Sequence, residues 1–216
     1  MMQGLIVDWG GVLTMPIHTA IGSWLKAAGV DHNHWGEVVR RWAEPLPGES
    51  SPVHRLERGE LAVEDFEHLL SAALALEGST VEAPGLVGEM FADLAIYEYS
   101  MTSLVTRARA AGIRTGLLSN SWGNEYDRSD WHEMFDVVVI SGEVGMRKPE
   151  PGIFELALTR IGLPAEECVF IDDMAHNIVA AELAGLVGIV HRTFDETAAE
   201  LEALFPGAGW IHQRAY

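Results

Sequence analysis

The sequence predicts an α/β fold: a doubly wound, Rossmann-like parallel sheet with a helical segment inserted after the first strand. Three observations lead to this prediction. Short apolar runs alternate with amphipathic helical patterns over most of the 216 residues. The runs are continuously apolar, as expected for strands buried on both faces of a parallel sheet. Between the first and second runs, a long segment shows helical periodicity without a convincing strand.

Five apolar runs are the predicted strands. The first, residues 5–7, ends at Asp8 and a Gly-Gly turn. The other four cover residues 113–118, 137–140, 169–171 and 187–190. Proteins with open α/β sheets bind their ligands at the carboxyl ends of the strands. The polar residues at those ends, Asp8, Ser119 and the pair Asp172 and Asp173, are therefore the candidate site residues.

Helical patterns closed by glycine separate the later strands. They cover residues 104–112, 151–162 and 177–185. Residues 16–88 form the predicted helical cap, and residues 1–15 and 89–216 form the predicted α/β core. Within the cap, the stretch 44–52 is rich in proline and glycine and is predicted to be an internal loop.

Charge and cysteine content exclude several classes of partner. Asp and Glu number 32 against 14 Lys and Arg, a formal net charge of −18. Such a surface repels phosphate backbones and anionic lipids, so neither nucleic acid nor a membrane is an expected partner. The N-terminus lacks the pattern of a signal peptide, and the one cysteine, Cys168, lies in an apolar run as a core thiol does. We expect a reduced, cytoplasmic setting.

The acidic pair Asp172 and Asp173 indicates a metal site. Adjacent carboxylates at a strand end raise each other's pKa unless a cation compensates. Mg²⁺ prefers oxygen ligands and is the expected cofactor. An acidic cap on the following helix would explain one carboxylate but not two. Asp8 by itself is also compatible with a turn or a helix cap, and its neighbours decide in favour of a functional role.

Two further segments supply groups that bind anions. Lys148 lies in a loop whose prolines hold its side chain in a defined place, although an isolated loop lysine would be a surface charge by default. Ser119 and Asn120 follow the second strand and offer a hydroxyl, an amide and backbone N–H groups to an anionic oxygen.

A carboxylate, a loop hydroxyl, a lysine and an acidic pair thus follow one another along the chain. This set resembles the haloacid dehalogenase superfamily of hydrolases. The matching segments are LIVDWGGVLT at 5–14, LLSN at 117–120, RKP at 147–149 with PGIF at 151–154, and FIDD at 170–173. The insert, with LERGE at 56–60, resembles the small helical cap of the branch that contains the amino-terminal phosphatase domain of soluble epoxide hydrolase.

The resemblance implies phosphoryl transfer to a carboxylate. Asp8 would attack phosphorus and form an aspartyl-phosphate, and Lys148 would be both a catalytic and a phosphate-binding residue. Ser119 and Asn120 would hold phosphoryl oxygens. The implied substrate is a small phosphorylated metabolite.

The same resemblance implies the ligands of Mg²⁺. They are Asp8, the backbone carbonyl of Gly10 and Asp173, with Asp172 as the near neighbour of the ion. Asn177 would support the metal loop.

Gly10 departs from the pattern of the family phosphatases, which carry a second aspartate at this position. That aspartate protonates the leaving alcohol and then activates water, and general acid–base catalysis is typically worth about 10²–10⁴ in rate. His18, Thr14 and His54 are possible substitutes, and none is compelling. A substrate whose leaving group needs no proton, such as an acyl phosphate, would avoid the loss.

Two alternatives therefore stay open. A dehalogenase-like hydrolase also lacks the second aspartate because halide leaves unprotonated, but that class needs no metal, so the acidic pair counts against it. A catalytically impaired binding or scaffold protein would retain the phosphate and metal residues. Trp9 and Trp122 flank the predicted site residues and are expected to make its entrance bulky and apolar.

Overall fold

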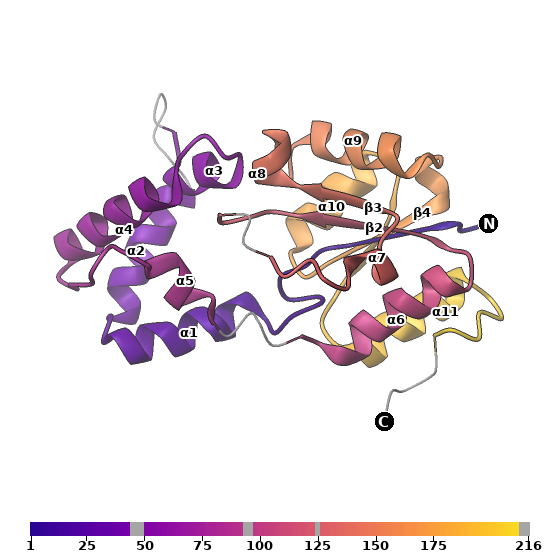
Figure 1. Ribbon diagram of the computed structural model, residues 1–216, viewed down its shortest axis with the longest axis horizontal. Helices are drawn as coiled ribbons and strands as arrows, with labels where there is room; N and C mark the ends of the chain where they lie inside the picture. Colours follow the sequence, from indigo (N-terminus) through magenta and orange to yellow (C-terminus); the bar gives the residue numbers. More distant parts are fainter. Residues whose placement is uncertain (44–49, 93–96, 124–125, 212–216) are drawn as a thin grey trace.

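The computed structural model describes residues 1–43, 50–92, 97–123 and 126–211. Its centre is one parallel sheet with the strand order β3-β2-β1-β4-β5. The strands are β1 (Gly4–Val7), β2 (Arg114–Ser119), β3 (Val137–Ile140), β4 (Cys168–Asp172) and β5 (Val187–Val190). The first strand lies in the middle and the chain winds outward from it in both directions, which confirms the predicted doubly wound fold (Figure 1).

Helices cover both faces of the sheet. In β1, Leu5 and Val7 belong to one apolar cluster and Ile6 to another, because successive side chains of a strand point to opposite faces. The first face is covered by α6 (Tyr99–Ala110) and α11 (Phe194–Leu204), and the second by α9 (Pro151–Ile161) and α10 (Ala175–Leu183) (Figure 1). Three short helices, α7 (Trp131–Met134), α8 (Ser141–Val144) and η2 (Ala165–Glu167), lie in the connections.

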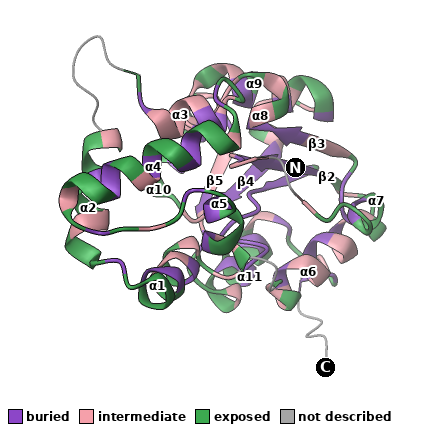
Figure 2. Ribbon diagram, turned by 60° about the vertical axis from the view of Figure 1, so that its left-hand side comes forward, coloured by how far each residue is buried: buried purple, intermediate pink, exposed green. Residues whose placement is uncertain are grey.

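The segment after β1 is helical and has an apolar core of its own. It contains α1 (Ile17–Ala28), α2 (His32–Ala43), α3 (Pro52–Glu57), α4 (Val63–Glu77) and α5 (Leu86–Met90), which we call the cap helices. Phe66 and Leu70, four residues apart on α4, are fully buried in it. The buried carboxylate of Glu67 accepts hydrogen bonds from Gly85 N–H and Val87 N–H, at 3.0 and 2.9 Å, and so ties α5 to α4. Figure 2 shows the buried faces of these helices turned inward.

The two connections between the cap helices and the sheet lie side by side. Thr14 and Tyr97 form an antiparallel bridge, and the N–H of Glu98 donates to the carbonyl of Leu13 at 2.8 Å. The chain therefore leaves and re-enters the α/β core at one place. Helix α5 runs across position 88, where the cap is predicted to end, and its Met90 is buried in the apolar core of the cap helices.

The predicted core elements are present with shifted ends, whereas α7, α8 and α11 are helices that the sequence analysis does not predict. Helix α6 begins at Tyr99 rather than near 104, because the Glu98 side chain accepts a hydrogen bond from Ser100 N–H and caps its first turn. Gly162 closes α9 in the left-handed conformation, as predicted. Most of the predicted loop at 44–52 lies outside the described residues. In the part of the chain that the structure describes, no helix combines the length and apolarity of a bilayer span.

Candidate active site

The ends of three neighbouring strands bring the predicted site residues together. Val7 of β1 pairs with Ile171 of β4, and the N–H of Asp8 donates to the Ile171 carbonyl at 2.8 Å. Asp8 and Asp172 therefore follow at the same level of the sheet. Ser119 ends β2, on the other side of β1. All three side chains are buried, with exposed fractions of 7% or less.

The site cluster consists of Asp8, Lys148, Asp172 and Asp173. One carboxylate oxygen from each of the three aspartates lies within 4.8 Å of the others. The ammonium of Lys148, 1% exposed, lies 2.8 Å from Asp8 Oδ1 and 2.6 Å from Asp172 Oδ2. Three carboxylates thus lie close together while one lysine pairs with two of them, and the formal charge of the cluster is negative.

The two adjacent aspartates have different surroundings. Asp172 accepts hydrogen bonds from Lys148, from the N–H of Met174 at 2.8 Å and from the Asn177 amide at 3.0 and 3.1 Å. Asp173 Oδ1 is buried without a hydrogen-bond partner among the described residues. A buried oxygen without a hydrogen bond destabilises the folded protein unless a group from outside the chain binds to it. Asp172 therefore positions Lys148, and Asp173 is free to bind a further group.

Gly11 makes room for the Asp173 carboxylate. Its φ is +77°, a conformation that L side chains rarely adopt, and a Cβ at this position would lie 2.3 Å from Asp173 Oδ2. The glycine turn after Asp8 is thus required by the close approach of the acidic pair.

Burial dominates the electrostatics of the site cluster. Burial, opposed by Lys148 and reinforced by Asp172 and Asp173, raises the pKa of Asp8 to about 8. Burial and the charge of Asp172 raise the pKa of Asp173 to about 6. Burial works against the charge of Lys148 as well, but Asp172 and Asp8 outweigh it and hold the pKa of the ammonium above its ordinary value. In a metal-free state Asp8 and Asp173 are therefore incompletely ionised at neutral pH.

Asn120 joins the loop after β2 to the lysine loop. Its amide donates to the Lys148 carbonyl at 3.0 Å, and its side-chain oxygen accepts from the Lys148 N–H at 2.8 Å. Both polar ends of the side chain are therefore engaged in positioning Lys148, rather than pointing to an open anion site. The neighbouring Ser119 hydroxyl lies 3.0 Å from the Tyr126 hydroxyl.

The space beside Gly10 is occupied by an apolar side chain. A Cβ on Gly10 would lie 2.8 Å from Cδ1 of Ile17. The hydroxyl of Thr14 is engaged with Gly11 N–H at 3.3 Å and the Met15 carbonyl at 3.2 Å, so it serves the turn.

The two histidines considered as substitutes for the missing aspartate differ in position. His18 is exposed at the start of α1, and its charge acts on Asp173. His54 lies among the charged residues between α3 and the lysine loop, where burial and Arg147 lower its pKa.

Four charged residues join the cap helices to the lysine loop; we call them the interface cluster. Glu57 pairs with Arg147, and Arg58 pairs with Glu150, whose Oε1 accepts from Arg58 Nε at 2.9 Å. The Trp122 indole donates to Glu57 Oε1 at 3.3 Å. The interface cluster therefore holds α3 against the residues next to Lys148.

Both tryptophans near the predicted site prove to be packing residues. Trp9 is 8% exposed and contacts the rings of Tyr97, Tyr126 and Trp131, with centroid separations of 5.2 to 5.6 Å. Trp122 packs on the rings of Phe66 in α4 and of Phe91, which follows α5. Trp9 is therefore drawn into the core rather than forming an apolar entrance, whereas Trp122 is half-buried between the cap helices and the loop after β2.

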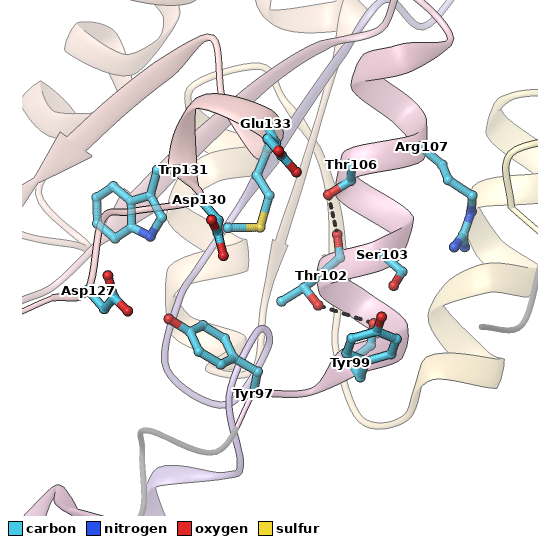
Figure 3. A pocket seen from close by; sticks show the side chains of 11 residues that line it. Tyr97, Tyr99, Thr102, Ser103, Thr106, Arg107, Asp127, Asp130, Trp131 and Glu133 are labelled. Carbon is cyan, nitrogen blue, oxygen red and sulfur yellow. Dashed lines mark hydrogen bonds between the residues drawn. The ribbon is translucent and has the colours of Figure 1, made fainter. Parts of the chain in front are cut away.

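A cavity of about 450 Å³ lies between α6 and α7, apart from the site cluster. Figure 3 shows the Tyr97 hydroxyl turned toward Asp127 and Asp130, with Thr102 and Thr106 of α6 on the opposite side of the tyrosine. No residue of the site cluster lines this cavity. Two residues that line the cavity, Tyr97 and Trp131, also contact the ring of Trp9.

A family model described as haloacid dehalogenase-like hydrolase matches residues 2–185. The chain belongs to this hydrolase family. It is 29% identical over 208 residues to acyl-CoA dehydrogenase family member 10 of Mus musculus. The matched region covers 94% of this chain but only 19% of that protein. It is 29% identical over 162 residues to the sesquiterpene phosphatase astK of Aspergillus oryzae, covering 72% of this chain and 80% of the other.

The predicted branch of the family is also confirmed. Bifunctional epoxide hydrolase 2 of Rattus norvegicus is 26% identical over 167 residues, 70% of this chain and 30% of that protein. A haloacid dehalogenase family enzyme of Bacteroides thetaiotaomicron, solved in complex with magnesium and inorganic phosphate, matches with a TM-score of 0.63 and 20% identity over 89% of this chain and 95% of that one. That structure supports the fold of the hydrolase.

Sequence patterns found the charged residues of this hydrolase and missed those that depend on packing. Asp8, Ser119, Asp172 and Asp173 lie at the predicted edge of the sheet, and the lysine loop brings Lys148 to Asp8 and Asp172. Ile17 and Tyr126 were missed. Ile17 is the first residue of an amphipathic helix, and Tyr126 lies seven residues after Ser119. Neither position has a sequence feature that distinguishes it from an ordinary core residue.

Proposed function

We propose that this hydrolase is a magnesium-dependent phosphatase of a small phosphorylated metabolite, with an aspartyl-phosphate on Asp8. The observation that carries the proposal is the site cluster, in which three carboxylates gather at one place near Ser119 and two of them, Asp8 and Asp172, pair with the buried Lys148. A phosphatase among the relatives and the magnesium and phosphate bound by the Bacteroides enzyme support it.

The residues present fit a magnesium ion. Asp173 Oδ1 is buried and has no partner in the described part of the chain, and its carboxylate lies next to that of Asp8. Burial raises the pKa of both groups, which a divalent cation would reverse. We assign Asp8, Asp173 and the Gly10 carbonyl as ligands, with Asp172 behind them because Lys148 and Asn177 already occupy its oxygens.

Magnesium would supply positive charge to the transferring phosphoryl group. The chain's own groups supply the rest. One Asp8 oxygen, Oδ1, is held by Trp9 N–H at 2.7 Å and by Lys148. The Asp8 carboxylate attacks phosphorus while the bond from phosphorus to the leaving oxygen breaks. Lys148 and the Ser119 hydroxyl stabilise the charge on the phosphoryl oxygens, and water then attacks the aspartyl-phosphate and releases inorganic phosphate.

Gly10 restricts the leaving group. With no carboxylate at this position and Ile17 in its place, the chain offers the leaving oxygen no acid there. Substrates with stable leaving groups, acyl phosphates above all, are therefore favoured over alkyl phosphates. We propose that the cap helices, residues 16–90 rather than 16–88 because α5 is continuous to Met90, cover this site and select the rest of the substrate.

One assay tests the proposed function. The purified chain is given acetyl phosphate, p-nitrophenyl phosphate and 2-chloropropionate, with and without magnesium, beside Asp8→Asn as the matched control. We expect magnesium-dependent phosphate release, fastest from acetyl phosphate, which Asp8→Asn lowers by at least about 10³-fold.

Other outcomes would contradict the proposal. Metal-independent chloride release would identify a dehalogenase-like hydrolase. Binding of magnesium and phosphate without turnover on any of these substrates would identify a binding or scaffold protein.

A further inference from the structure

Tyr126 stands directly behind the Ser119 hydroxyl. Its own hydroxyl lies 3.0 Å from Ser119 Oγ and is also within hydrogen-bonding reach of the Ser121 side chain. The phenol thus bridges two hydroxyls of the loop after β2. Ser119 Oγ has a second contact, the Asn120 carbonyl, but at 3.4 Å this is a long hydrogen bond.

Aromatic packing fixes the Tyr126 ring. Its centroid lies 5.6 Å from that of Trp9, edge to face at 86°, and 5.4 Å from that of Trp131. Trp9 directly follows Asp8 in the chain. The ring is therefore held by the same residue that follows the nucleophile, and its hydroxyl cannot move freely away from Ser119.

Tyr126 is equipped to donate a hydrogen bond. Burial raises the pKa of the phenol above its ordinary value, although the hydrogen bonds to Ser119 and Ser121 oppose this, so it keeps its proton at neutral pH. A serine hydroxyl has one proton and two lone pairs. If the phenol donates to Ser119 Oγ, the Ser119 proton is free to point toward an anionic oxygen at the sheet edge.

We propose that Tyr126 is a positioning residue for phosphate binding, which donates to Ser119 Oγ and thereby directs the Ser119 proton to a phosphoryl oxygen. The inference rests on the proposed function and adds to it a residue outside the four motifs. The chain of hydrogen bonds polarises each member, so that Ser119 donates more strongly than an isolated serine.

The chain contains a matched control in Tyr97. Its ring also contacts Trp9 edge to face, with the same centroid separation of 5.6 Å and an angle of 82°. Its hydroxyl is turned toward Asp127 and Asp130, which line the cavity between α6 and α7 (Figure 3). Tyr126→Phe and Tyr97→Phe therefore remove the same atom from two rings packed alike against Trp9.

The experiment measures phosphate binding and turnover in these variants. The dissociation constant of inorganic phosphate is determined calorimetrically in the presence of magnesium, and kcat and KM are measured with acetyl phosphate. We expect Tyr126→Phe to weaken phosphate binding and lower kcat/KM by about tenfold, and Tyr97→Phe to change each by less than about twofold. In the Ser119→Ala background, Tyr126→Phe should have almost no further effect, and melting temperatures should show that each variant is folded.

The other possible outcomes contradict the role of Tyr126, the phosphatase function, or both. Equal effects of the two Phe variants, or additive effects of Tyr126→Phe and Ser119→Ala, would overturn the role of Tyr126 and leave the proposed phosphatase function standing. Phosphate binding without turnover in the wild type would refute the phosphatase, while the binding constants would still decide the role of Tyr126. A wild type that neither binds phosphate nor turns over would refute both.

Discussion

The site cluster and the interface cluster lie next to each other, joined by the peptide bond between Arg147 and Lys148, yet their charges are balanced differently. The site cluster has three carboxylates and one ammonium. The interface cluster has two carboxylates and two guanidinium groups, each paired across the boundary between the cap helices and the core. Burial is deep in the first and partial in the second.

This difference separates a binding site from a structural contact. Paired charges satisfy one another and need no further ligand. Unpaired buried carboxylates raise each other's pKa and leave an oxygen such as Asp173 Oδ1 without a partner, which a cation can correct. The excess of carboxylates over cations therefore distinguishes the site cluster from the interface cluster, whereas the presence of acidic residues alone does not.

Removing the lysine should cause the largest change. Lys148→Met leaves the carboxylates of Asp8 and Asp172 buried without their cation, so we expect a loss of about 3–5 kcal/mol in the free energy of unfolding and of at least about 10³-fold in turnover. Denaturant unfolding and phosphate release measure the two effects. The same substitution at exposed Lys26 is the control and should change stability by less than about 0.5 kcal/mol. Similar losses in both variants would mean that the site cluster is not stabilised by Lys148.

Adding a carboxylate at Gly10 should increase activity. We expect Gly10→Asp to raise hydrolysis of an alkyl phosphate by about 10²-fold, with a larger gain when Ile17→Ala is added, because Cδ1 of Ile17 lies 2.8 Å from the new Cβ. Gly10→Asn has nearly the same shape without an acid and serves as the control. Equal rates for the Asp and Asn variants would show that this position does not supply the proton.

The interface cluster should couple energetically. A double-mutant cycle with Glu57→Gln and Arg147→Gln should give a coupling of about 1–3 kcal/mol in denaturant unfolding, since the two side chains are 11% and 14% exposed. The exposed pair Arg128 and Glu143, each 42% exposed, should give less than about 1 kcal/mol in the same measurement. Equal couplings would make the interface cluster an ordinary surface contact.

The smallest expected effect is the pH dependence of stabilisation by magnesium. The folded-state pKa values of Asp8 and Asp173, about 8 and about 6, lie above the ordinary value of 3.8. The metal-free protein therefore loses stability as pH rises through these values, and magnesium must displace protons below them. We expect magnesium to raise the melting temperature by several degrees more at pH 8 than at pH 5.5, at constant ionic strength. An equal rise at both pH values would place the ion elsewhere.

The sequence predicted the fold and the charged residues for one physical reason. Continuous apolar strands imply a parallel sheet, and a parallel sheet gathers its strand ends at one edge. Asp8, Ser119 and Asp172 could be placed there from their positions alone. Lys148 could be predicted only through the resemblance of its motif, since a loop lysine carries no such positional signal.

The partners of each side chain could not be predicted, because they depend on packing between distant segments. The contact of the Asn120 side-chain amide with the backbone of Lys148 is one such case, and the binding of a phosphoryl oxygen by Asn120 stays a prediction. Tyr126 and Ile17 enter the site only through contacts with Ser119 and the space beside Gly10. Their residue types are common in cores, and their roles follow from geometry.

Trp122 belongs to two regions at once. It follows Asn120 by two residues, yet its ring packs on Phe66 and Phe91 at 5.0 and 5.3 Å between centroids. If the cap helices swing away from the sheet, this indole must leave an apolar pocket for water or pull its loop along. Movement of the cap helices and movement of the loop after β2 are therefore coupled through this ring, in addition to the ion pairs of the interface cluster. Burial of the Trp122 ring against Phe66 and Phe91 favours the arrangement in which the cap helices lie against this loop.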